Sequence, residues 1–149
     1  MAEAAVLTLN AGSSSLKFAL FGAADSGRRL LDGAVHEIGR PGARLTVRNR
    51  RDQQVADITG AFATHEEALT RVLETVGDAG RRWEIRAVGH RLAHGGPDCD
   101  CPKPVTPALV AKLKRLVPLA PLHLPANIAG IEAVLAQRPD IPQVACFDT

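Results

Sequence analysis

Near the start of the chain stand residues 6–21, VLTLNAGSSSLKFALF. The first apolar run stops at Asn10, and a second run alternates polar and apolar residues from Ser15 onward, as strands with one buried face do. Between them lies a short turn of small polar residues containing Gly12, which can adopt a positive φ because it has no Cβ. We therefore expect two strands joined by a tight turn, and the rest of the chain is organised around this hairpin.

The turn has the composition of an anion-binding loop. Successive backbone N–H groups in such a turn can converge on an anion. The hydroxyl groups of Ser13, Ser14 and Ser15 add donors, and Lys17 adds a positive charge at the start of the second strand. An ordinary serine-rich hairpin is the alternative, because single short motifs also occur by chance.

Length and composition fit one globular domain. The chain has 149 residues, 46% of them hydrophobic and 23% charged, and a net charge of +2. That charge is too small to indicate a nucleic-acid or anionic-membrane partner. No apolar run reaches the roughly 18 residues of a transmembrane helix, and no signal-peptide pattern opens the chain, so we expect a cytoplasmic location. Cys99, Cys101 and Cys146 have neither zinc-site nor disulfide spacing, so we expect free thiols.

The remaining pattern alternates strands and helices. Helices are expected behind the caps Thr64 and Thr106 and again from about Ile128 to Pro139. Thr64 and Glu67 form a capping box, and His65 is expected to face solvent. Further strands are expected near residues 30–38, 45–47, 55–58, 85–88 and 143–147. The fold class is therefore α/β, a mixed β-sheet with flanking helices on both faces.

Five arginines lie between Arg40 and Arg51, which is one feature of a nucleic-acid-binding patch. No aromatic residue lies among them to stack on bases. The sequence therefore favours a solvated, charge-protected hairpin at the edge of the sheet.

A second informative stretch is residues 85–96, IRAVGHRLAHGG, where a strand ends and two glycines predict a turn. Ligands of open α/β sheets lie beyond the carboxyl ends of the strands. The planar guanidinium of Arg91 suits two-point pairing with a carboxylate or phosphate. His90 and His94 are each either a hydrogen-bonded structural histidine or a ligand contact.

Four motifs, in order along the chain, resemble those of the acetate kinase family and its propionate and butyrate kinase relatives. They are NAGSSSLK at 10–17, GHRLAHGG at 89–96, LAPLHLPAN at 119–127 and FDT at 147–149. Leu124 stands where the family has asparagine. The resemblance implies a ribonuclease H-like, actin-like ATPase fold. It also implies that residues 1–149 are the N-terminal, substrate-side domain of a longer kinase, without its C-terminal nucleotide-binding domain.

The resemblance further implies reversible transfer of the ATP γ-phosphoryl group to acetate or propionate, with Mg²⁺ as cofactor and a homodimeric full-length protein. Because Ala93 stands where the family often has the larger valine, we expect the pocket to admit propionate as well as acetate and to discriminate only weakly between them. The implied roles are carboxylate binding by Arg91, contact with the phosphoryl group by His123, action at the active site by Asp148, phosphate binding by Ser13, Ser15 and Lys17, metal binding by Asn10, and pocket lining by Ala93 and Leu122.

A carboxylate substrate is already an anion at neutral pH, so this reaction needs no general base. Two other classes stay open. One is a non-catalytic binding or regulatory module, or a truncated remnant of such a kinase. The other is a ribonuclease H-like nuclease, against which Asn10 counts, because those enzymes have an acid at that position.

Overall fold

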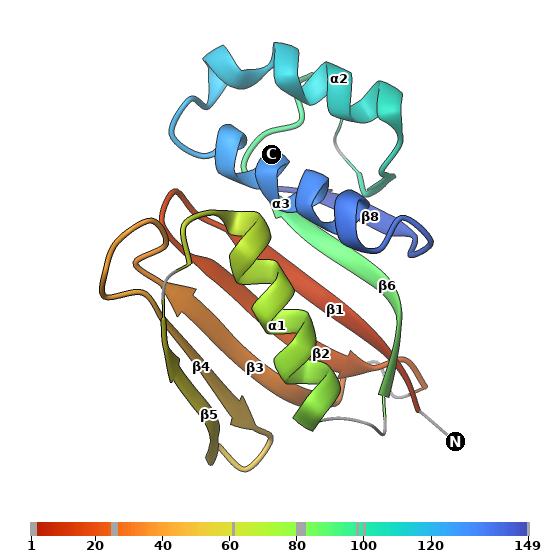
Figure 1. The fold of residues 1–149 in the computed structure, drawn as a ribbon. Coiled ribbons are helices and arrows are strands. Elements are labelled where there is room, and N and C mark those ends of the chain that lie inside the picture. The colour runs from red at the N-terminus through yellow and green to blue at the C-terminus, as the bar shows by residue number, and fades with distance from the viewer. Residues whose placement is uncertain are drawn as a thin grey trace.

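The fold is known from a computed structural model that describes residues 3–24, 27–60, 62–79, 83–97, 99 and 101–148, with the backbone alone for 77–79. The described strands form one mixed sheet in the order β5-β4-β3-β2-β1-β6-β8-β7 (Figure 1). The strands are β1 Glu3–Ala11, β2 Leu16–Gly22, β3 Arg29–His36, β4 Arg44–Asn49, β5 Gln54–Thr59, β6 Trp83–Leu92, β7 Lys103–Pro104 and β8 Gln143–Phe147. The helices are α1 His65–Ala79, α2 Pro107–Arg115, the short 3₁₀ helix η1 Val117–Leu119 and α3 Leu124–Gln137.

The pairing of the strands confirms the predicted mixed sheet. Strands β1 to β5 pair in sequence as antiparallel neighbours. Strand β6 then lies parallel to β1, and β8 lies parallel to β6. The carboxyl ends of β1, β6 and β8 therefore meet at one edge of the sheet. The two-residue strand β7 has no signal in the sequence and pairs with β8 only through Lys103 and Pro104.

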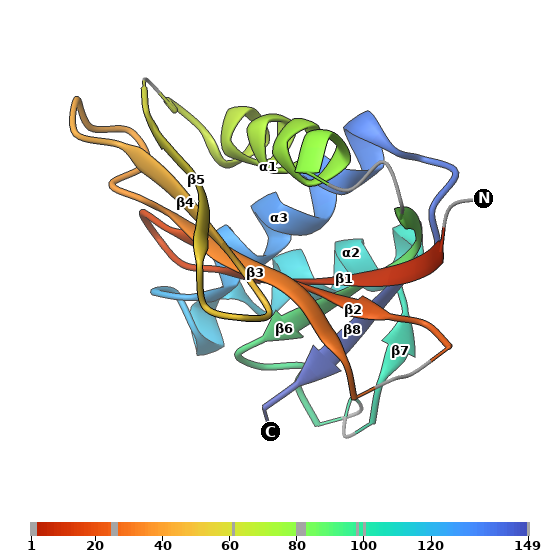
Figure 2. The ribbon, with the colours of Figure 1, turned by 90° about the horizontal axis from the view of Figure 1, so that it is seen from below.

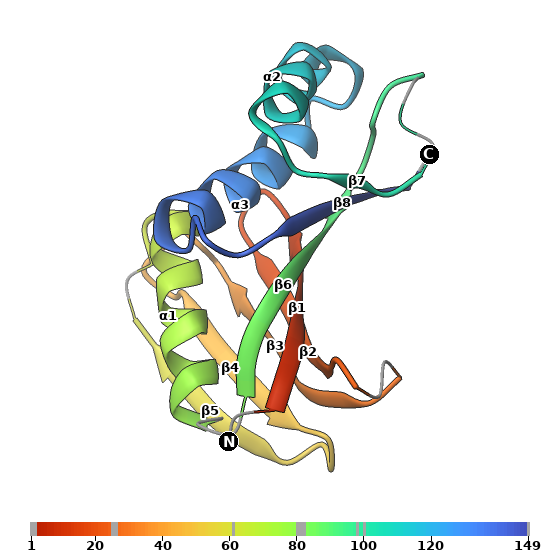
Figure 3. The same cartoon turned by 90° about the vertical axis from the view of Figure 1, so that its right-hand side faces the viewer.

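The helices occupy one face of the sheet, so the prediction of helices on both faces is wrong for the described residues. Helices α1 and α3 lie side by side over the sheet, and α2 packs on α3 (Figures 2 and 3). The connections β5-α1-β6 and β6-α2-α3-β8 both cross the sheet in the same direction. Parallel crossovers are right-handed, so two in the same direction place their helices on the same face.

This one-sided arrangement follows the alternation of β1. Leu7 and Leu9 are buried beneath α1 and α3, whereas Thr8 and Asn10 point to the opposite face and are only partly buried. A second apolar cluster, which includes Leu92, Leu113 and Ile131, holds α2 and α3 against the ends of β6 and β8. One face of the sheet thus carries the core, and the other is left open among the described residues.

The helix caps are largely as predicted. The Thr106 hydroxyl accepts the N–H of Leu109 at 3.1 Å, and Thr64 accepts the N–H of Glu67 at 3.2 Å. The Glu67 carboxylate accepts the N–H of Ala63, not that of Thr64, at 2.8 Å. Leu135 of α3 is 40% exposed, whereas Ala133 and Val134 beside it are buried in the core. No helix in the described ranges is long and apolar enough to cross a membrane.

The arginine-rich stretch lies on exposed positions of β4 and the turns beside it, and β5 is an edge strand, as predicted. Arg44 Nε donates to the Asp57 carboxylate across β4 and β5 at 2.6 Å. This hydrogen bond, together with the opposite charge of Arg44, holds the pKa of Asp57 below its ordinary value.

Candidate active site

The turn between β1 and β2, residues 12–15, is called the serine turn here. The N–H of Gly12 donates to the carbonyl of Ser15 at 2.9 Å. No residue of this turn has a positive φ, so the reason predicted for Gly12 is wrong. A Cβ at this position would lie 2.7 Å from the Ser15 hydroxyl, so a larger residue here would require that hydroxyl to move.

In the serine turn, carbonyl acceptors are occupied while the N–H donors of the serines are free among the described residues. The carbonyl groups of Gly12 and Ser14 accept hydrogen bonds from His65 and from the N–H of Ile38, at 2.6 and 2.9 Å. The backbone N–H groups and hydroxyls of Ser13, Ser14 and Ser15 have no acceptor within the described part of the chain. The turn therefore offers free donors, which is the property that an anion site requires. His65 is half-buried against this turn, so the prediction that it faces solvent is wrong.

A groove of about 610 Å³ runs over the open face of the sheet beside this turn. Asn10, Lys17 and Arg91 all line it, so three of the predicted site residues come together. Lys17 is the register partner of Asn10, and Asn10 and Arg91 each follow the paired residues Leu9 and His90. The remaining lining residues are Thr8, Leu9, Phe18, Ala19, Asp32, Gly33, Ala34, Thr46, Arg48, Gly89, His90 and Cys146.

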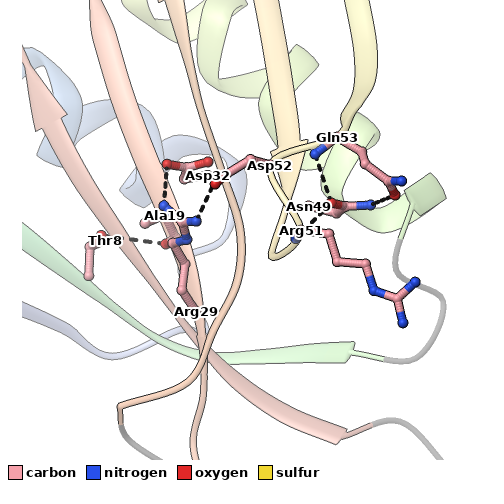
Figure 4. Close-up of polar contacts among 8 residues, drawn as sticks. All are labelled: Thr8, Ala19, Arg29, Asp32, Asn49, Arg51, Asp52 and Gln53. Atoms are coloured by element: carbon pink, nitrogen blue, oxygen red, sulfur yellow. Dashed lines mark hydrogen bonds and ion pairs between the residues drawn. The ribbon is translucent and has the colours of Figure 1, made fainter.

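The groove combines an apolar floor with positive charge at its rim. Lys17 and Arg48 are exposed and have no ionic partner in the described ranges. Deeper in the sheet, Asp32 pairs with Arg29 at 2.9 Å, and Thr8 donates to the carbonyl of Ala19 at 3.4 Å (Figure 4). The free charges favour a small anionic ligand.

Arg91 and Asp148 form an ion pair where β6 and β8 end. Arg91 Nη2 lies 2.9 Å from Asp148 Oδ2, and its Nε lies 3.1 Å from both carboxylate oxygens. These hydrogen bonds, and then the opposite charge, raise the pKa of Arg91 above its ordinary value. Asp148 thus fixes one side of the guanidinium, while Nη1 has no partner among the described residues and remains available for an anion.

The loop before α3 places His123 at the N-cap of that helix. The imidazole is exposed and makes no hydrogen bond within the described ranges. Leu122 is 77% exposed, and neither residue lines the groove. Leu124 is fully buried in the core, so it contributes packing where a polar residue would contribute a contact.

The two histidines left open by the sequence both have structural partners. His90 is 3% exposed, and its Nε2 lies 2.5 Å from Gln143 Oε1. Burial lowers the pKa of His90 to about 4, so its imidazole is neutral at physiological pH. His94 Nδ1 accepts the N–H of Gly96 at 2.8 Å, and Gly96 has a φ of 76°, which confirms the predicted turn.

The other predicted site residues lie near the edge where the carboxyl ends of β1, β6 and β8 meet, but they do not line the groove. Ala93 is half-buried directly after β6, and Ser13 and Ser15 belong to the serine turn. Cys146 lines the groove as the register partner of Arg91. Cys99, Cys101 and Cys146 are all free thiols, as predicted.

Asn127 lies beside the site, but the sequence predicted no role for it and showed it only as the last residue of the LAPLHLPAN motif. It is 5% exposed in the first turn of α3. Its Nδ2 donates to the carbonyl of Ala11 at 2.8 Å, and its Oδ1 accepts the N–H of Ala93 at 3.0 Å. The sequence shows only an asparagine in the LAPLHLPAN motif; its burial and its two partners are visible only in the structure, and buried amides need such partners.

The described residues hold no group of three or more His, Cys, Asp and Glu side chains able to bind a metal. Asn10 and Asp148 do supply oxygen donors, which suit Mg²⁺, and Mg²⁺ commonly takes one or two protein oxygens with substrate phosphates. Asn10 lines the groove, and Asp148 is paired with Arg91, which lines it too.

Comparison with known proteins shows the family and the fold of this chain. The sequence model of the Acetokinase family matches residues 5–149. The chain belongs to the acetokinase family. It is 44% identical over 143 residues to the acetate kinase of Deinococcus radiodurans. The aligned region covers 96% of this chain and 35% of that relative. The chain thus spans about a third of the length of such curated acetokinase relatives.

Solved acetokinase structures have the same fold. The acetate kinase of Porphyromonas gingivalis superposes with a TM-score of 0.90 at 36% identity, over 98% of this chain and 37% of that one. A propionate kinase from Francisella tularensis superposes with a TM-score of 0.87 at 29% identity, over 99% of this chain and 37% of that one. The mixed sheet with flanking helices is therefore that of the acetokinase family.

Proposed function

We propose that this chain forms the substrate-side half of an acetate kinase-type phosphotransferase, which transfers the γ-phosphoryl group of ATP to acetate or propionate. The observation that carries the proposal is the groove in which Asn10, Lys17 and Arg91 meet beside the serine turn. The remaining length of the relatives, about two thirds, would supply the nucleotide-binding part.

Arg91 has the role of holding the acceptor carboxylate. Asp148 occupies its Nε and Nη2, which leaves Nη1 directed elsewhere with its donors unused in the described ranges. A guanidinium fixed in this way loses little further freedom when it binds a carboxylate. Asp148 is then a positioning residue for Arg91 and has no need to remove a proton.

The serine turn and Lys17 have the role of binding the phosphoryl group. The free N–H groups and hydroxyls of the turn and the lysine charge would neutralise the phosphoryl oxygens as charge builds up on them. His123, exposed at the start of α3, is proposed as a further contact. Asn10 and Asp148 would hold Mg²⁺ through water, and this ion would screen the phosphate charges.

The reaction balances without proton transfer. One oxygen of the ionised carboxylate attacks the γ-phosphorus, the bond from that phosphorus to the bridging oxygen breaks, and ADP leaves with the electron pair. The products are an acyl phosphate and ADP. Catalysis then depends on position and charge, which is what the groove residues offer.

The test is titration of the chain with acetate, propionate and MgATP, beside a coupled kinase assay. We expect acetate and propionate to bind with affinities within about tenfold of each other. ATP should bind weakly or not at all, and this chain alone should show no turnover. Replacing Arg91 by alanine should weaken acetate binding by about tenfold or more, since a charge-assisted hydrogen bond is lost.

The matched control is Arg86→Ala. Arg86 is an exposed arginine on the same strand, it pairs with Glu84, and it does not line the groove. Its replacement should leave acetate binding unchanged. Equal losses in the two variants would contradict the proposed role of Arg91, and absence of acetate binding would contradict the proposed function.

A non-catalytic binding module is the second candidate, because the groove and the free donors of the serine turn can bind an anion whether or not a reaction follows. Acetate binding without turnover, even when the missing part of a relative such as the Deinococcus radiodurans enzyme is fused to the chain, would select it.

A further inference from the structure

Two helices hold consecutive carbonyl groups at the start of the serine turn. Asn127 Nδ2, from α3, donates to the carbonyl of Ala11 at 2.8 Å. His65 Nε2, at the start of α1, lies 2.6 Å from the carbonyl of Gly12 and must donate to it, because a carbonyl only accepts. The turn is therefore held from behind at two adjacent peptide groups.

Asn127 also reaches the other arm of the groove. Its Oδ1 accepts the N–H of Ala93, two residues beyond Arg91, at 3.0 Å. The orientation of the amide is determined, since a backbone N–H can only donate and a carbonyl can only accept. One buried side chain thus connects the end of β1, which leads into the serine turn, with the end of β6, which carries Arg91.

The packing around Asn127 leaves little space for water to replace its hydrogen bonds to Ala11 and Ala93. Asn127 is 5% exposed, so water does not take over its partners. A Cβ on Gly130, one turn further along α3, would lie 3.3 Å from the Cβ of Ala11, so the helix lies directly against β1. A buried acceptor that loses its donor costs far more than an exposed one.

We propose that Asn127 and His65 are positioning residues for the two halves of the site. Together they hold the serine turn by its carbonyl groups, which directs its N–H groups toward the phosphoryl group. Asn127 in addition keeps this turn in register with Arg91 and hence with the carboxylate. This inference rests on the proposed function and assigns roles to two residues that do not line the groove.

The test separates the two contacts of Asn127 by substitution in this chain, with inorganic phosphate and acetate as probes and amide hydrogen exchange as a structural readout. Asn127→Asp keeps an acceptor for Ala93 but places a carboxylate oxygen against the Ala11 carbonyl, at a pH well above the carboxyl pKa. We expect phosphate binding to weaken about tenfold while acetate binding stays within about twofold. Asn127→Leu should weaken both by about tenfold and expose the Ala93 amide to exchange.

His65 acts on the turn alone, so its variants should affect one probe. His65→Leu removes the donor, and phosphate binding should weaken about fivefold while acetate binding is unchanged. His65→Gln keeps an N–H donor of similar reach and should restore phosphate binding to within about twofold. Rescue by glutamine distinguishes a positioning hydrogen bond from simple packing.

The matched control is Gln137→Leu. Gln137 lies on the same helix and donates to the carbonyl of Glu66 at 3.0 Å, away from the groove. Both affinities should be unchanged in this variant. If all variants weakened both probes in proportion to their melting temperatures, or if none changed either, the inference would be wrong while the proposed function stood. Binding of neither probe by the unaltered chain would overturn both.

Discussion

Two four-residue turns at opposite ends of the sheet use their backbone groups in opposite ways (Figure 1). In the turn between β4 and β5, residues 50–53, Asn49 accepts three N–H groups. Its side-chain oxygen accepts those of Arg51 and Gln53 at 2.9 and 3.1 Å (Figure 4). Its carbonyl accepts that of Asp52 at 3.0 Å. In the serine turn the carbonyl groups of Gly12 and Ser14 are occupied, while the N–H groups of its three serines are free within the described ranges.

The two turns differ in their free backbone donors as well as in their charge. The hairpin end carries more arginines, yet three backbone N–H groups of its turn already donate to Asn49, and Arg29 is paired with Asp32 and Asp52. The serine turn has fewer charges, but its serine N–H groups are free in the described ranges, and the carbonyls of Gly12 and Ser14 are held by His65 of α1 and by the N–H of Ile38. Supporting contacts behind a loop can therefore decide what the loop offers to a ligand.

The largest expected effect is on the free energy of unfolding, and it comes from His90, which is buried near the carboxyl end of β6. The pKa of His90 is about 4, below its ordinary value near 6.5, so between these values the unfolded chain binds more protons than the folded one. Stability should therefore fall as pH decreases through this window, by about 3 kcal/mol in total. Urea unfolding at a series of pH values measures this.

The exposed His36 is the control for that experiment. His90→Leu should remove most of the pH dependence, whereas His36→Leu should leave it in place, because His90 is buried and His36 is exposed. A flat stability curve for the unaltered chain between these pH values would contradict the burial of a neutral His90.

The next effect tests the contrast between the turns directly. Lys17→Met should weaken the binding of inorganic phosphate by about tenfold, since a charge beside free donors is lost. Arg51→Met, beside the satisfied turn, should change it by less than about twofold. Nuclear magnetic resonance titration gives both constants, and equal losses would show that net charge alone governs binding.

The smallest effect concerns stability. Asn49→Ala removes the acceptor of two N–H groups, so the free energy of unfolding should fall by about 1 kcal/mol, with phosphate binding unchanged. Ser14→Ala should change stability by less than about 0.5 kcal/mol, because its hydroxyl has no partner in the described part. Thermal unfolding of both variants checks this. A larger loss of stability for Ser14→Ala would mean that the serine turn satisfies its own hydrogen bonds, as the turn of residues 50–53 largely does.

Much of the fold could be predicted from local patterns. The alternation of Leu16, Phe18 and Leu20 and the cap at Thr106 depend on neighbours in the sequence, and both predictions are confirmed. The placement of the helices depends on the direction of each crossover, which no local pattern contains. That is why helices were expected on both faces.

The site divides in the same way. The sequence by itself determined which residues we propose for the chemistry, because donors and charges such as those of Lys17 and Arg91 are properties of residue types, and both residues were expected at strand ends. Only the tertiary structure decided that His65 and Asn127 lie behind the serine turn. Residues 53 and 116 positions from their partners meet there through helix packing, and such contacts leave no periodic trace in the chain.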